Sequence, residues 1–141
     1  MALAGGGGAG NTAGSGGTAG VGKGLNYVRL DGITYAYAYS GFVTSPASTD
    51  TFTLLEFTTG SEFIVAKADF FYPVYTGDNF QYRILMNGEN ITGHEVIHGA
   101  DANLINPINL VIAPFTKVEL TAKSTVGNAV DQAATVIGRV Y

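Results

Sequence analysis

The chain has 141 residues, about the size of one domain, and it contains no cysteine, which excludes disulfide frameworks, thiolate metal sites and cysteine nucleophiles. Its 7 basic and 11 acidic residues give a net charge of −4, and they form no basic cluster that would bind nucleic acid. Charged residues make up 13% of the chain, about half the usual fraction. We therefore expect a protein that covers part of its surface against other subunits. No apolar run is long enough to span a membrane.

The first 24 residues are rich in glycine and alanine and hold 11 of the 20 glycines in the chain. Such a segment cannot build a core, because glycine loses the most conformational entropy on ordering. Gly17 to Lys23 matches the start of the phosphate-binding loop motif, but Gly24 stands where the motif needs Ser or Thr, and no helix pattern follows. We interpret residues 1–24 as an extended arm and residues 25–141 as one folded domain.

From Leu25 onward, hydrophobic residues alternate with small or polar ones, which is the pattern of β-strands. The segment Ile33 to Tyr39 places Tyr35, Tyr37 and Tyr39 on one face of a strand, together with Ile33. After a break at residues 44–49, further alternating sets predict strand faces. In chain order these are Ile64, Ala66, Ala68, Phe70 and Tyr72; Phe80, Tyr82, Ile84 and Met86; Ile108, Leu110 and Ile112; Val118, Leu120 and Ala122; and Val136, Gly138 and Val140.

Asn87-Gly88 predicts a tight β-hairpin, because both central positions of a type I′ turn need positive φ. This turn sets Met86 opposite Glu89 and Ile84 opposite Ile91. Around it, eight or nine strands at spacings of roughly 8 to 12 residues predict an all-β, antiparallel sandwich. No helix pattern exceeds about two turns, and residues 128–133 are the best candidate for one.

The strongest chemical motif is HEVIH at residues 94–98, which matches the zinc signature H-E-x-x-H. That signature requires a helix, so that both histidines share one face a single turn apart. Glycines flank the motif and the Asn87-Gly88 hairpin leads directly into it, so we expect a strand instead. In a strand, His94 and His98 would lie roughly 13 Å apart, too far to share a metal, even with Asp101 or Glu119 as a third ligand.

No other catalytic pattern stands out, since carboxylates such as Glu56, Asp69 and Glu119 can be paired in any β-protein. The tyrosines at 35, 37 and 39 are the candidate binding residues. They could pack in a core or a subunit interface, where tyrosine buries a large area and keeps one polar end. They could also form a platform on which sugar rings stack.

Residues 51–141 carry the segments TLLEFTTGSEFIVAKADFF, DNFQYRILMNGENI, NLVIAPFTKVELTA and VIGRVY. This series resembles the small β-sandwich or single jelly-roll structural proteins of icosahedral viruses and phages, including capsid decoration (cement) and vertex proteins. The resemblance implies a jelly-roll sandwich of about eight strands preceded by an extended arm. It also implies homo-oligomers, often trimers for cement proteins and pentamers at vertices, with arms that reach across neighbouring capsid subunits.

From these observations we expect a non-enzymatic virion protein that stabilises an icosahedral shell by binding between capsid subunits. Its partners would be further copies of itself, most simply as a trimer, and a major capsid protein. The alternatives are a vertex (penton) protein, or a carbohydrate-binding or receptor-binding module such as a spike or fibre head. The sequence predicts no catalytic residue, no cofactor and no metal site.

Overall fold

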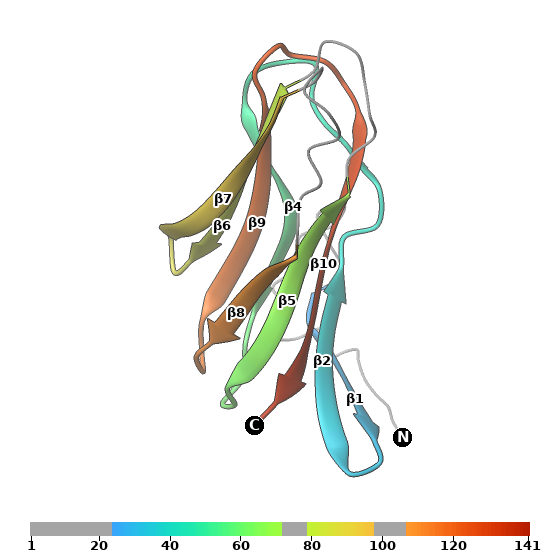
Figure 1. Ribbon diagram of the computed structural model, residues 1–141, viewed down its shortest axis with the longest axis vertical. Helices are drawn as coiled ribbons and strands as arrows, with labels where there is room; N and C mark the ends of the chain where they lie inside the picture. The colour runs from blue at the N-terminus through green and yellow to red at the C-terminus, as the bar shows by residue number, and fades with distance from the viewer. Residues whose placement is uncertain (1–23, 72–78, 98–106) are drawn as a thin grey trace.

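The computed structural model (Figure 1) describes residues 24–71, 79–97 and 107–141. Within these ranges the chain forms ten strands and no helix. The described residues therefore contain no helix long and apolar enough to cross a membrane. The strands are β1 (Asn26–Leu30), β2 (Ile33–Tyr39), β3 (Val43–Thr44), β4 (Thr51–Thr58), β5 (Ile64–Phe71), β6 (Asn79–Met86), β7 (Glu89–Ile97), β8 (Ile108–Ile112), β9 (Lys117–Ser124) and β10 (Asp131–Val140). The arm predicted for residues 1–24 lies outside the described residues, apart from Gly24.

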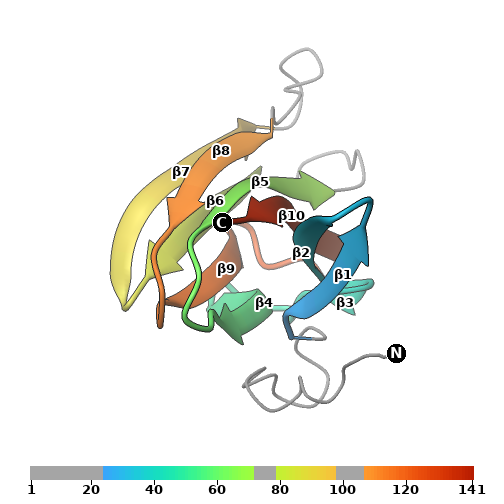
Figure 2. The same cartoon turned by 90° about the horizontal axis from the view of Figure 1, so that it is seen from below.

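The strands build two antiparallel sheets that face each other, as the view from below shows (Figure 2). The six-stranded sheet has the order β1-β2-β10-β5-β8, with the short β3 also paired to β10. The four-stranded sheet has the order β4-β9-β6-β7. The predicted all-β antiparallel sandwich is therefore confirmed, and β1 and β3 are the strands that the expected eight lacked.

The strand pairs nest inside one another along the chain. β2 pairs with β10, β4 with β9, β5 with β8, and β6 with β7. Successive pairs alternate between the two sheets, so the chain follows the path of one long hairpin wound around the core. This path brings β2 beside β10, although nearly the whole domain separates them in sequence.

The predicted alternating residues fill the space between the sheets. Burying this much apolar surface is the main force that holds the two layers together. The fully buried set includes Leu54, Leu55, Phe57, Ile64, Tyr82, Ile84, Ile112, Val118, Leu120 and Val136. Tyr72 lies outside the described residues.

The β6–β7 hairpin turns at Asn87-Gly88 as predicted, with φ angles of 50° and 84°. Met86 pairs with Glu89, which confirms the predicted register at the turn. The second predicted pair is wrong, because Ile84 lies opposite Thr92. A register shift follows Ile84, where a β-bulge on the returning strand adds one residue and moves Ile91 out of the pair.

The helix candidate at residues 128–133 is also wrong. β10 begins at Asp131, whose backbone partner is Thr44 of β3. Just before it, the Val130 amide donates to Ser45 Oγ at 2.8 Å, and the Ser45 amide donates to the Val130 carbonyl at 2.9 Å. These long-range bonds satisfy the backbone groups that a helix would have paired within itself.

One polar pair lies inside the core. The Tyr82 hydroxyl donates to Gln132 Oε1 at 2.6 Å, and both side chains are fully buried. The Phe70 ring lies against Tyr82 with its centroid 4.8 Å away. Among the described side chains, Gln132 Nε2 is buried without a hydrogen-bond partner. The hydrogen bond from Tyr82 therefore offsets part of the free-energy cost of burying the Gln132 amide.

We expect Tyr82→Phe to lower the free energy of unfolding by about 1–3 kcal/mol, because it leaves the Gln132 amide oxygen buried without its donor. Urea unfolding followed by circular dichroism measures this loss. The double variant Tyr82→Phe/Gln132→Met removes both polar groups at similar volume and should recover most of the stability. A double variant no more stable than Tyr82→Phe would show that the amide is not the source of the cost.

Candidate functional site

The outer faces of the two sheets differ in chemistry. On the four-stranded sheet, the outward positions of β4, β6, β7 and β9 carry mainly polar and charged side chains, which are Glu56, Gln81, Arg83, Glu95, Lys117, Glu119 and Lys123. Ile91 is the large hydrophobic residue exposed on these four strands within the described ranges. This face has the composition of a surface that stays in water.

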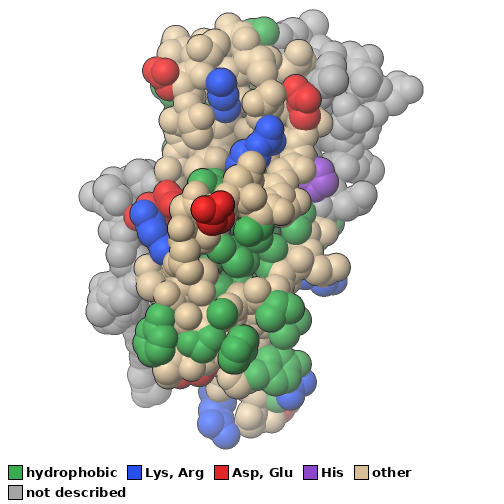
Figure 3. Space-filling model, turned by 90° about the vertical axis from the view of Figure 1, so that its left-hand side faces the viewer, with side chains coloured by type: hydrophobic (Ala, Val, Ile, Leu, Met, Phe, Trp, Pro, Cys, Tyr) green, Lys and Arg blue, Asp and Glu red, His purple; other side chains and the backbone are tan. Residues whose placement is uncertain are grey.

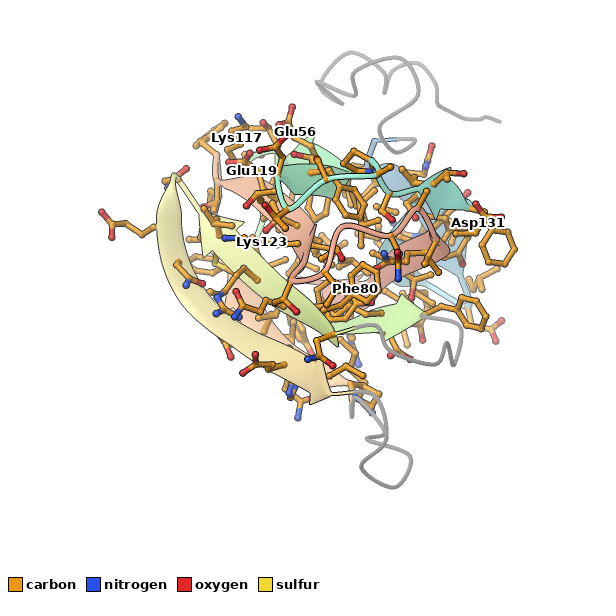
Figure 4. The ribbon with its side chains drawn as sticks, turned by 90° about the horizontal axis from the view of Figure 1, so that it is seen from above. Glu56, Phe80, Lys117, Glu119, Lys123 and Asp131 are labelled. Atoms are coloured by element: carbon orange, nitrogen blue, oxygen red, sulfur yellow. The ribbon has the colours of Figure 1, made fainter. Side chains whose placement is uncertain are left out.

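An ion-pair cluster lies on this polar face, where Figure 4 shows Glu56, Lys117 and Glu119 side by side. Lys117 Nζ lies 3.3 Å from a Glu56 carboxylate oxygen and 3.7 Å from one of Glu119. The hydrogen bond that Lys117 donates to Glu56, followed by the charge of Glu119, raises the pKa of Lys117 above its usual value. Lys117 bridges the two carboxylates, so this grouping is a structural ion-pair cluster on the surface. Asp69, the third carboxylate considered in the sequence, lies in β5 of the other sheet.

The outer face of the six-stranded sheet is largely hydrophobic. One row of paired residues crosses five strands from edge to edge: Val28, Tyr35, Arg139, Val65 and Val111. Large hydrophobic side chains remain exposed along these strands on the same face, namely Val28, Leu30, Tyr39, Val65, Phe71, Val111 and Ile137. The charged residues Lys67, Asp69 and Arg139 lie among them on this face. Exposed apolar surface of this extent marks interaction sites on soluble proteins.

At one edge of this face, strands β1, β2 and β10 form an open groove of about 560 Å³, which we call the tyrosine groove. It is lined by Val28, Leu30, Tyr35, Tyr37, Tyr39 and Ile137. The Tyr37 and Tyr39 rings lie 5.3 Å apart between centroids, tilted by 38°. The three tyrosines predicted as binding residues are thus brought together in one concave, mostly apolar site.

The tyrosines face outward because smaller residues between them face the core. Ala36 and Ala38 are fully buried, and Gly138 of β10 lies beside Ala36 in the register. Alternation puts neighbouring side chains on opposite faces, so burying the two alanines turns the tyrosines toward the surface. The sequence had left both a core and an interface open for them, and the structure selects the outer face.

Three groove residues were missed from the sequence, namely Val28, Leu30 and Ile137. Asp31-Gly32, with φ angles of 50° and 76°, forms the turn that folds β1 back onto β2. Asp-Gly between hydrophobic runs is a strong hairpin signal, and it would have placed Val28 beside Tyr35. Ile137 lies on the strand face opposite the predicted set Val136, Gly138 and Val140, and its pairing with Tyr37 is a long-range contact that the strand pattern did not contain.

Tyr27 lies on the opposite face of β1 and is not part of the groove. Burial raises the pKa of its hydroxyl above the usual value, while a hydrogen bond with the backbone of Gly60 acts in the opposite direction. The Glu62 carboxylate adds to the rise. Tyr27 therefore links β1 to the turn that follows β4 and stays protonated at neutral pH.

Residues 94–97 of the HEVIH segment lie in β7, which confirms the predicted strand for these four residues. His94 lies opposite Tyr82 in the register. His98 and Asp101 lie outside the described residues, as do residues 17–23 of the phosphate-loop match, and the distance between the two histidines stays a prediction. In the described part of the chain, no three His, Asp or Glu side chains are grouped so that they could hold a metal ion.

Comparisons with known proteins add little to this geometry. No family model matches the chain, and no curated protein matches it. Among solved structures, the chain is similar to Drosophila melanogaster CENP-C in its crystal structure bound to CAL1, with 10% sequence identity over 86% of this chain and 82% of that one. The TM-score is 0.21, a similarity on which no argument about function rests.

Proposed function

We propose that this chain is a non-enzymatic capsid protein that decorates or cements an icosahedral shell by binding between subunits. The observation that carries the proposal is the hydrophobic outer face of the six-stranded sheet, in a chain whose other sheet presents a charged face. Large exposed apolar patches are rare on proteins that work as monomers in solution. The face is expected to bind further copies of the chain and a major capsid protein.

The strand order supports the jelly-roll form of this proposal. A jelly roll has eight strands in two sheets, paired as two Greek keys, and it is common in viral capsid and lectin domains. The nested pairs from β2 with β10 to β6 with β7 follow that scheme, and β1 and β3 are additions at its margin. Since a fold alone does not determine a function, the hydrophobic face is the stronger support.

The proposed mechanism is stabilisation by mass action. A protein that binds the assembled shell, and not its separate subunits, shifts the equilibrium toward the shell. A stable contact needs about 800 Å² from each partner, and removing apolar area from water contributes roughly 25 cal/mol per Å².

Arg139 lies in the middle of the face with its guanidinium over the Tyr141 ring, at 5.0 Å from the centroid. Because burial in an interface would leave the N–H donors of this guanidinium unpaired, a partner is expected to offer Arg139 a hydrogen-bond acceptor.

Co-sedimentation tests the proposal. The purified chain is mixed with shells of the major capsid protein from the same virus, lacking this chain, and the pelleted fraction is measured. We expect saturable binding and a higher temperature of shell disruption. Deleting residues 2–24 should abolish attachment while the β domain keeps its circular dichroism spectrum. Shells that neither bind the full chain nor gain heat resistance would contradict the proposal.

Two alternatives stay open, and the tyrosine groove favours one of them. Aromatic rings in an open groove can stack on sugars, which is the arrangement of a carbohydrate-binding spike or fibre head. Binding on a glycan array that Tyr37→Ala removes, with the oligomer intact, would support that function. A vertex protein is the other alternative, and a pentamer in solution would favour it over cement.

A further inference from the structure

The turn between β8 and β9 carries an aromatic side chain that the fold does not use. Phe115 is 72% exposed, the highest exposure among the large hydrophobic residues of the described ranges. Its φ angle is 55°, in the left-handed region that bulky residues rarely adopt. Pro114 precedes it, and a turn with proline followed by positive φ normally takes glycine at the second position. A phenylalanine here is both strained and exposed to water.

Hydrogen bonds hold this turn in place. The Phe115 amide donates to the Gly60 carbonyl at 2.8 Å, and the Thr116 amide donates to Thr59 Oγ1 at 2.8 Å. Thr59 Oγ1 in turn donates to the Ala113 carbonyl at 2.8 Å. The turn is thus tied to the β4–β5 connection on both sides of Phe115. An exposed aromatic ring on a rigid support loses little entropy on binding, as binding anchors require.

The tyrosine groove and the Phe115 turn lie at different places on the molecule. The groove is built on β1, β2 and β10, whereas β8, which leads into the turn, is the last strand at the other edge (Figure 2). Hydrophobic side chains gather at the lower end of the side where β8 lies (Figure 3). Each copy therefore has a concave apolar site on the outer face of the sheet and a rigid aromatic projection at the end of β8.

We infer that copies of this chain associate head to tail, with the Phe115 turn of one copy seated in the tyrosine groove of the next. This inference rests on the proposed function and names the partner of the groove as a second copy. A concave and a convex patch at different places on one subunit give a heterologous contact, which closes into a ring when the rotation permits. A symmetric contact of groove against groove would leave the Phe115 ring exposed to water, and the strained backbone at Phe115 would support no binding contact.

The test replaces Phe115 with asparagine, which tolerates the left-handed conformation. Phe115→Asn should weaken self-association at least 100-fold in sedimentation velocity, while its melting temperature at monomer concentration stays the same or rises. Val126→Asn is the control, since Val126 is 49% exposed, lies in the β9–β10 connection and is not part of the hydrophobic outer face. It should leave the association unchanged.

A mixing experiment separates a head-to-tail contact from a symmetric one. Phe115→Asn keeps an intact groove, whereas Tyr37→Asp damages the groove and keeps an intact Phe115 turn. Each variant alone should be monomeric. A mixture of the two should yield one-to-one heterodimers in native mass spectrometry. Assembly by Phe115→Asn alone, or a mixture without heterodimers, would overturn the inference. If only Tyr37→Asp dissociates the oligomer, the inference fails and the proposed function stands. If neither variant changes the wild-type mass, the proposed role of the hydrophobic face fails as well.

Discussion

Tyr37→Asp is expected to weaken self-association at least 100-fold, or by about 2.7 kcal/mol. Tyr37 lies in the tyrosine groove beside Tyr39 and next to Ile137 in the register. Tyrosines in desolvated pockets often dominate binding energy. The substitution removes the ring and places a carboxylate where an interface would exclude water, which is costly for an unpaired charge. Sedimentation equilibrium over a concentration series gives the change in dissociation constant.

The same experiment needs a variant that makes an equal chemical change elsewhere. Ile91→Asp serves, because Ile91 is 45% exposed on β7 of the four-stranded sheet. It exchanges an exposed hydrophobic residue for aspartate on the other sheet, and the dissociation constant should not change. Equal weakening by both variants would mean that the loss comes from general destabilisation and not from the groove.

Gly138→Ala is expected to lower the free energy of unfolding by about 2 kcal/mol. Gly138 lies on the inner face of β10, between Ala36 of β2 and Ala66 of β5. A Cβ atom at this position would lie 2.6 Å from the Val65 carbonyl oxygen and 2.7 Å from Ala66 Cα. Because both are backbone atoms, the methyl group can be accommodated only by moving a strand. Urea unfolding measures the loss.

Gly60→Ala is the control for the Gly138 variant. A Cβ at Gly60 would meet the end of the Glu62 side chain at 3.0 Å, and that side chain can rotate away. Alanine also restricts the unfolded chain, which stabilises by about 0.4–1 kcal/mol where no strain results. Gly60→Ala should therefore be neutral or slightly stabilising. A loss of stability similar to that of Gly138→Ala would rule out crowding between strands as the cause.

Much of the fold could be predicted because β-structure has a local signature. The two-residue period of β5, β6 and β9 predicted which residues share a face, and most of these are buried between the sheets. Asn87-Gly88 predicted its turn from the conformations that these residues tolerate. Strand pairing across the domain was beyond this kind of reasoning, since β2 and β10 meet only after the chain has wound around the core.

The face to which the tyrosines point could not be predicted for the same reason. Hydrophobicity alone would send Tyr35 and Tyr37 inward and leave Ala36 outside. The inner row instead joins Ala36, Gly138 and Ala66, three small residues from distant strands that let the backbones pack closely. The sequence shows the alternation but not these neighbours. The exposed position of Phe115 was not predicted. Its positive φ is a conformation that phenylalanine rarely adopts, and a prediction from sequence assumes the common conformations of each residue type.

The mass of the wild-type chain in solution tests the central claim most directly, namely that the outer face of the six-stranded sheet is a subunit interface. Sedimentation velocity on the full chain, from low to high micromolar concentration, should show a discrete species at a multiple of 14.6 kDa. Three copies would agree with a cement protein. A species that remains at one copy over the whole range would contradict the account.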